Sequence, residues 1–352
     1  MKDSALPKKR IYLFDNLKAI LIFLVVFFHI FEIIRYDNLF NKGLYFFVYV
    51  FHMPLFIFIS GYFYNRKKTF KNIAKYIGIY ILFQTLYIIY LKYILEKNGE
   101  IDFYNMIFIK PIWIMWYLVS LSVYNFAAFF INIKSKKVVC AILIINIILA
   151  CLAGYIKCIG KDLSMSRNIV FFPYFLLGYF VRQNYDVLAL RESFYRKAKD
   201  KSTIAVVVIS LIVIAGYILY LYLNIKDLKP EIVFHNKSYA SSGSNPIQRL
   251  LLYLPAVSMI FLNLLLVPNK EYKLITKVGT NTLYIFLIHG FVKYYLDMHK
   301  GIFQDAPNEL VKYIVALLLT IIIIGVICIL AEFVKNFKNY VRKNNLKKEG
   351  VI

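Results

Sequence analysis

Long apolar segments, separated by short stretches rich in lysine and arginine, run through this chain from end to end. A helix needs about 20 apolar residues to cross the hydrocarbon layer of a membrane. Segments of about that length occupy 11–34, 44–64, 73–95, 112–131, 138–156, 165–181, 203–224, 250–267, 279–296 and 310–334. The sequence therefore predicts an all-α fold, a polytopic transmembrane helical bundle of about ten spans.

The distribution of charge gives the predicted orientation of these spans. The formal net charge of +24 could indicate a protein that binds nucleic acid, but the cations occur in short clusters between apolar runs, where they set the topology. With the N-terminus placed inside, 27 Lys and Arg residues fall in cytoplasmic segments and 15 in outer segments, which agrees with the positive-inside rule. We expect cytoplasmic N- and C-termini in a multi-pass protein of the plasma (inner) membrane, lipids as neighbours, and no nucleic-acid partner.

The remaining composition excludes other classes of protein. With 61% hydrophobic residues, the chain is too apolar for an ordinary soluble domain. Residues 1–352 are expected to form a single membrane domain with no appended soluble domain. The four cysteines include no CxxC pair and no histidine at metal-ligand spacing, so no metal site is expected.

The first apolar segment carries ionisable residues, which are rare in membrane spans and typical of functional sites. Eleven helical steps from Lys18 to His29 return to within roughly 20° of the starting direction, about 16 Å further along the axis. Both side chains therefore share one face, and Asp15 and Glu32, three positions outside them, can reach it. The alternative is that Lys18 only snorkels to the interface and that His29 is a buried structural histidine.

This first segment resembles the first-helix signature of the acyltransferase 3 family of integral membrane acyltransferases, in which Arg or Lys precedes His by eleven positions. The sequence Phe51-His52-Met53-Pro54-Leu55-Phe56-Ile57-Phe58-Ile59-Ser60-Gly61-Tyr62 resembles the second-helix motif of the fucose 4-O-acetylase-like branch. Later family segments are echoed in the right order at 116–118, 173–179 and 279–290. The resemblance spans nearly the whole chain.

The resemblance implies acyl transfer from an acyl-CoA to a hydroxyl group, which needs a base or an acyl carrier. His29 is the best candidate for either role because imidazole titrates near neutrality. Glu32 could orient His29 and stabilise its cationic form. Lys18 lies about 16 Å nearer the cytoplasm, a separation comparable to the pantetheine arm of coenzyme A, so we expect the nucleotide phosphates near Lys18.

The basic loop 65–75 permits two interpretations. It could be a topology anchor that touches anionic lipid. It could also bind the 3′-phosphate and pyrophosphate of coenzyme A, because Lys and Arg bind such anions directly. The family has basic residues at the start of its third helix that resemble Lys71 and Lys75.

Three further residues are weaker candidates for substrate contacts. His52 precedes Pro54 and could either cap a helix or meet substrate. Trp116 fits an interfacial aromatic belt, although the family resemblance makes it a candidate for a substrate contact as well. His289 is expected at a depth comparable to His29, so the two could line one cavity. The polar outer loop 225–249 would suit a lid over a sugar or could simply be solvated.

Together these features predict an O-acetyltransferase that moves acetyl from cytoplasmic acetyl-CoA to a cell-surface polysaccharide or its lipid-linked precursor. The alternative is a transporter or flippase for a lipid-linked glycan, which would be expected to distribute charged residues over several helices around a central cavity. In the sequence, the intramembrane charge concentrates in the first span.

Overall fold

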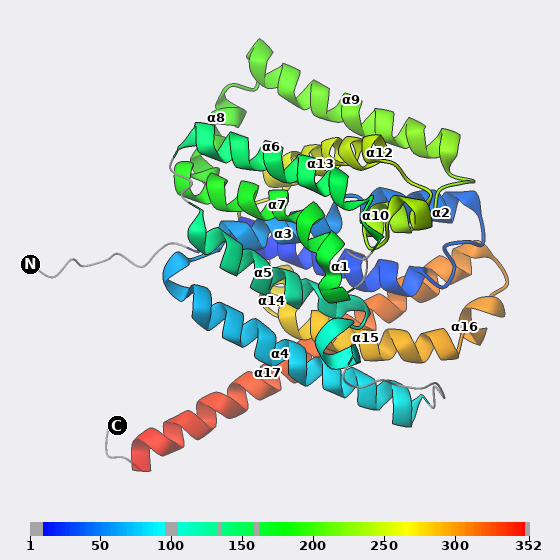
Figure 1. The fold of residues 1–352 in the computed structure, drawn as a ribbon. Helices are drawn as coiled ribbons and strands as arrows, with labels where there is room; N and C mark the ends of the chain where they lie inside the picture. The colour runs from blue at the N-terminus through cyan, green and yellow to red at the C-terminus, as the bar shows by residue number, and fades with distance from the viewer. Residues whose placement is uncertain (1–9, 96–104, 132–134, 158–161, 349–352) are drawn as a thin grey trace, which may run out of the picture. The chain divides into compact units, whose positions relative to one another are not determined.

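In the computed structural model, residues 10–95, 105–131, 135–157 and 162–348 are described. All regular structure in these ranges is helical, which confirms the predicted all-α class (Figure 1). The chain divides into two compact units: a terminal unit, formed by residues 1–34 and 267–352, and a central unit, formed by residues 35–266. Cys158, one of the four cysteines, lies outside the described residues.

Eight of the ten predicted spans coincide with helical segments long and apolar enough to cross a membrane. These segments are Tyr12–Phe31, Leu39–Tyr62, Arg66–Ile94, Trp113–Phe130, Lys136–Ala153, Lys201–Asn224, Pro246–Leu266 and Glu309–Val341. The predicted spans 165–181 and 279–296 are also helical, but the first carries more polar residues and the second is interrupted at Asn281. A total of ten crossings stays a prediction.

The terminal unit is built around its first helix. Its elements are α1 (Tyr12–Phe31), α14 (Lys273–Thr280), α15 (Thr282–Met298), the short α16 (Gly301–Gln304) and the long α17 (Glu309–Lys348). Helix α1 packs against α14, α15 and α17. The segment that is first in sequence is thus enclosed by elements from the last quarter of the chain.

The cytoplasmic end of α1, in the predicted orientation, is held by polar contacts and by a glycine. Asn16 is only 2% exposed, and its Nδ2 donates to the carbonyl oxygens of Pro268 and Lys270, both at 2.9 Å. The Thr276 hydroxyl donates to Asn16 Oδ1 at 3.2 Å. A Cβ on Gly279 would overlap the backbone carbonyl of Asp15, so only glycine permits this approach of α14 to α1.

The central unit holds twelve α-helices among the described residues. They are α2 (Leu39–Tyr49), α3 (His52–Tyr62), α4 (Thr69–Ile89), α5 (Trp116–Phe130), α6 (Lys136–Ala153), α7 (Met165–Asn184), α8 (Val187–Arg196), α9 (Lys201–Asn224), α10 (Glu231–Phe234), α11 (Tyr239–Ser242), α12 (Pro246–Leu251) and α13 (Tyr253–Leu266). Single turns of 3₁₀-helix lie at Arg66–Lys68, Trp113–Met115 and Asp162–Ser164, and π-helical turns at Tyr90–Ile94 and Asn105–Ile109.

The second predicted span is a helix with a break. Helix α2 ends at Tyr49, and α3 begins at His52. Pro54 therefore stands in the first turn of α3, where its missing N–H has no intrahelical partner to lose. The break thus lies a few residues before the proline, and not at it.

Helices α3 and α7 approach each other closely through one glycine on each. A Cβ on Gly61 would overlap the carbonyl of Phe175, and a Cβ on Gly178 would overlap the carbonyl of Phe58. Glycine at both positions therefore permits the close approach of the two helices. Because the contacts are with backbone atoms, no side-chain movement could relieve them.

Candidate active site

The terminal unit brings two histidines from distant parts of the chain together. His29 lies in the last turn of α1 and His289 near the middle of α15. His29 Nδ1 is 2.9 Å from His289 Nε2, and the rings are nearly parallel, with an interplanar angle of 7°. The side chains are 8% and 2% exposed, respectively. The common depth expected from the sequence is therefore a direct contact.

The hydrogen bonds fix which nitrogen of each neutral ring carries the proton. His289 Nδ1 is 2.9 Å from the carbonyl oxygen of Ile285, which can only accept, so Nδ1 is the donor. His289 Nε2 is then an acceptor, and His29 Nδ1 must donate to it. In neutral His29 the lone pair consequently lies on Nε2, the form in which an imidazole acts as a base.

A charged pair lies one helical turn beyond the histidine pair. Glu32 follows His29 by three residues, and Lys293 follows His289 by four, so the two helices repeat the same side-by-side arrangement. Lys293 Nζ is 3.3 Å from Glu32 Oε2 and 2.6 Å from Asp297 Oδ2. The side chains of Glu32 and Lys293 are 12% and 11% exposed, so this is a largely buried ion pair.

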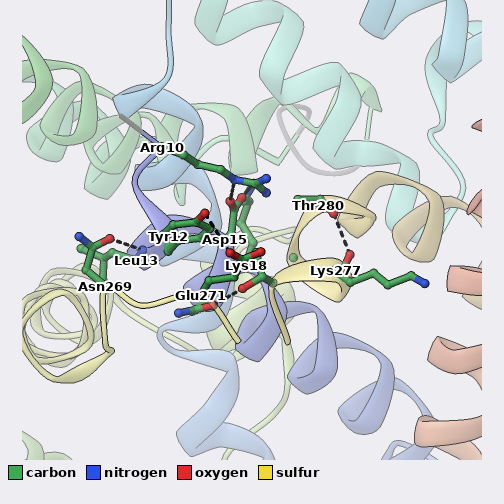
Figure 2. A network of polar contacts seen from close by, with 12 residues as sticks. Arg10, Tyr12, Leu13, Asp15, Lys18, Asn269, Glu271, Lys277 and Thr280 are labelled. Atoms are coloured by element: carbon green, nitrogen blue, oxygen red, sulfur yellow. Dashed lines mark hydrogen bonds and ion pairs between the residues drawn. The ribbon is translucent and has the colours of Figure 1, made fainter. Parts of the chain in front are cut away.

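Lys18 lies at the other end of α1 in a second ionic cluster (Figure 2). Asp15 bridges two cations: its Oδ1 is 2.9 Å from Lys18 Nζ, and its Oδ2 is 2.8 Å from Arg10 Nε. The Asp15 side chain is 11% exposed and that of Lys18 27%. The ammonium group is thus held at a fixed place.

The relation of Lys18 to His29 follows from the unbroken helix between them. Helix α1 runs from Tyr12 to Phe31 without interruption, so eleven residues separate the two side chains along one helix by about 16 Å. The polar stripe predicted from spacing therefore lies on a continuous scaffold.

The other candidates for binding coenzyme A belong to the central unit. Lys71 and Lys75 both lie on α4 and are exposed. Four residues apart, they share one face of the helix and are accessible to an anionic group. The preceding turn adds Arg66, whose guanidinium lies 5.1 Å from the ring centre of Phe129.

His52 has a clear structural role. Only 2% exposed, it places Nδ1 2.9 Å from the carbonyl oxygen of Val48 and packs edge-on against Tyr49. Its ring thus caps a carbonyl group at the end of α2, one of the two roles left open by the sequence.

Trp116 is 8% exposed and packs against Phe171, with ring centres 5.4 Å apart. The guanidinium of Arg167 lies 4.8 Å from the centre of the Trp116 ring. This indole therefore positions an arginine, a relationship that a purely interfacial aromatic residue would not require.

Two residues of interest were missed from the sequence. Lys293 could have been found by its spacing of four residues from His289 on a predicted helix. Arg167 could have been found as a cation at the edge of the sixth predicted span; its Nε donates to the carbonyl oxygen of Phe234 at 3.0 Å.

Comparison with protein families gives a match over nearly the whole chain. Residues 11–330 match the model of the acyltransferase 3 family, described as an acyltransferase domain. No curated protein and no solved structure matches the chain. Because the matched region covers nearly all of the sequence and includes both histidines, the chain belongs to this family of acyltransferases.

Proposed function

We propose that this protein is a membrane O-acetyltransferase of the fucose 4-O-acetylase-like branch. It takes acetyl from cytoplasmic acetyl-CoA and transfers it to a hydroxyl group of a cell-surface polysaccharide or its lipid-linked precursor. The observation that carries the proposal is the contact between His29 and His289, because it leaves the first imidazole with its lone pair on Nε2. A second, buried ring that orients the first is the arrangement expected of a base rather than of a packing residue.

The chemistry assigned to His29 balances without a further reactant. Its Nε2 takes the proton of the acceptor hydroxyl while the hydroxyl oxygen attacks the thioester carbonyl carbon. As the tetrahedral intermediate collapses, the carbon–sulfur bond breaks, and the protonated imidazole returns that proton to the departing thiolate of coenzyme A. His289 Nε2 accepts the hydrogen bond from His29 Nδ1–H throughout and keeps the ring in its reactive orientation.

We assign the stabilisation of the charged imidazolium of His29 to the Glu32–Lys293 pair, one helical turn away. The Glu32 carboxylate favours the imidazolium that forms during transfer, and Lys293 holds that carboxylate in place. The two charges of the ion pair partly cancel, so the effect on His29 is smaller than that of an isolated carboxylate.

We assign the binding of the acyl donor, acetyl-CoA, to the opposite end of α1. Lys18, held by Asp15, supplies a cation for the phosphates of acetyl-CoA, and the extended pantetheine arm covers the distance of about 16 Å to His29. Lys71 and Lys75 are further candidates for the phosphates because they are exposed on one face of α4.

The test uses three forms of the full-length protein in membranes: wild type, His29→Ala and His299→Ala. The last is a matched control, since His299 is an exposed residue just after α15. Each is incubated with acetyl-CoA labelled in the acetyl group and with total cell-envelope glycan, and both glycan label and free coenzyme A are measured. We expect transfer by wild type and His299→Ala, and none by His29→Ala.

The same assay separates the enzyme from the flippase alternative, which gains some support from Lys293 and Arg167 on helices other than α1. A flippase would release no coenzyme A in any variant. Transfer that persists in His29→Ala would remove this residue from the reaction while leaving the acyltransferase assignment intact.

A further inference from the structure

The central unit contains a small cavity between α3, α7, α12, α13 and the segment that precedes α11. Its polar lining includes Tyr174 of α7, His235, Arg249 of α12 and Tyr253 of α13. The volume open to the centre of a water-sized group is about 10 Å³, so the cavity has room for one such group. None of these residues is part of the histidine site in the terminal unit.

Arg249 places a positive charge on the cavity wall. The residue is 4% exposed, its Nη1 donates to the carbonyl oxygen of Ala150 at 2.9 Å, and its guanidinium lies 4.7 Å from the Tyr239 ring centre. No carboxylate of the described residues lies within ion-pair distance of this guanidinium. A buried cation without an acidic neighbour is costly unless another group compensates its charge.

Two neutral groups add hydrogen-bonding capacity to the same wall. His235 is 8% exposed and packs edge-on against Phe171, while Tyr174 is 5% exposed. Neither the His235 ring nor the Tyr174 hydroxyl forms a hydrogen bond with any residue that the structure describes. Buried polar groups of this kind normally have a partner, so their partner is expected inside the cavity.

A second guanidinium strengthens the positive potential. Arg167 donates through Nε to the carbonyl oxygen of Phe234, the residue before His235, and it too has no carboxylate within ion-pair distance in the described parts of the chain. Burial, reinforced by the charges of Arg249 and Arg167, lowers the pKa of His235 well below its usual range. His235 is therefore neutral near pH 7 and still offers one N–H donor.

The occupant must be small and should be an anion. Arginine N–H groups can only donate, the tyrosine hydroxyl can donate, and two guanidinium groups disfavour any cation. A water molecule would leave the positive charge uncompensated. We propose that this cavity binds one halide-sized anion, held by Arg249, Tyr174 and His235. The anion ties together α7, α12 and the segment that precedes α11.

The test measures thermal unfolding of the full-length protein in detergent at constant ionic strength, with potassium gluconate replaced stepwise by potassium chloride or bromide. Gluconate is too large for the cavity. For wild type we expect a Tm that rises with halide concentration, because a ligand that binds only the folded state stabilises it. Tyr174→Phe removes only the hydroxyl and should weaken the halide affinity by about tenfold.

Arg196→Gln serves as the matched control because Arg196 is exposed at the end of α8, outside the cavity, and should keep the wild-type response. Crystals grown with bromide should show anomalous scattering between Arg249 and Tyr174. A Tm independent of halide in wild type, an unchanged response in Tyr174→Phe, or a water molecule at this position in bromide crystals would each overturn the proposal. None of these readouts depends on acyl transfer.

Discussion

Nδ1 of His29 lies 2.9 Å from Nε2 of His289, and Nδ1 of the second ring lies 2.9 Å from the carbonyl oxygen of Ile285. In this chain of two imidazoles and one carbonyl, the carbonyl determines which nitrogen donates in each hydrogen bond. A buried backbone carbonyl thus does for His289 what a carboxylate does in many catalytic dyads, but without adding a negative charge.

His289 should act by positioning His29. We expect His289→Ala to lower kcat about 10²-fold or more with little change in KM for acetyl-CoA, because the reactive tautomer is no longer favoured. His289→Gln should recover much of the activity, since its amide oxygen can accept the hydrogen bond from His29 Nδ1–H. Steady-state kinetics on the three proteins provide the check, and equal losses in the alanine and glutamine variants would argue for a packing role.

Lys18 should affect the donor rather than the chemical step. Replacing it with alanine is expected to raise KM for acetyl-CoA about tenfold, because a charge-assisted contact to phosphate is lost. Lys18→Arg should retain most of the affinity. If direct binding measurements show the same affinity for acetyl-CoA in wild type and Lys18→Ala, the residue is only a topology anchor.

The Glu32–Lys293 pair should be energetically coupled. Glu32→Gln and Lys293→Met are each expected to destabilise the protein, and the double variant should lose less than the sum of the two. For partly buried charges in contact, the coupling should be about 0.5–3 kcal/mol. Chemical unfolding of the four proteins completes this double-mutant cycle, and strict additivity would show that the two charges do not interact.

The contact between α3 and α7 should tolerate no side chain at its glycines. Gly61→Ala is expected to lower Tm by several degrees, since the added methyl group would meet the backbone carbonyl of Phe175. Gly78→Ala on α4 is the control, because nothing lies within 4 Å of the added atom there. Similar thermal stability for the two variants would contradict the close approach.

His235 should make stability depend on pH. Its folded-state pKa is lowered by burial and by Arg249 and Arg167, whereas in the unfolded chain it is near 6.5. Below pH 6.5 the unfolded state therefore binds more protons, and stability falls as the pH is lowered. In gluconate buffer, the Tm of wild type should drop more between pH 7 and pH 5 than that of His235→Gln.

Hydropathy was sufficient to predict the helical class, because each span must be apolar over its own length whatever its neighbours are. It could not predict the break between Tyr49 and His52. At the break, His52 donates a hydrogen bond to the carbonyl of Val48, which is a local contact with no hydropathy signal. Nor could it predict the close packing of Gly279 on Asp15, since any small residue would give a similar pattern.

The candidate site was predictable only within one helix. Helical periodicity placed Lys18, His29 and Glu32 on one face because their separation is fixed by the backbone. The partners of Glu32 and Arg167 lie on other elements and depend on packing, to which a single sequence gives no direct access. His289 was placed at the right depth by counting spans, but the contact itself required the tertiary structure.

The enclosure of α1 by the last quarter of the chain has a consequence for biosynthesis. Asn16 and Pro268 are 252 positions apart, and His29 and His289 are 260 apart. At roughly 5–20 residues per second, a ribosome needs ten seconds or more to make the intervening chain. During that time the nascent first helix, with its lysine and histidine, waits in the membrane or its insertion machinery without these partners. The histidine pair is thus assembled last, and a chain released early would carry His29 without its contact to His289.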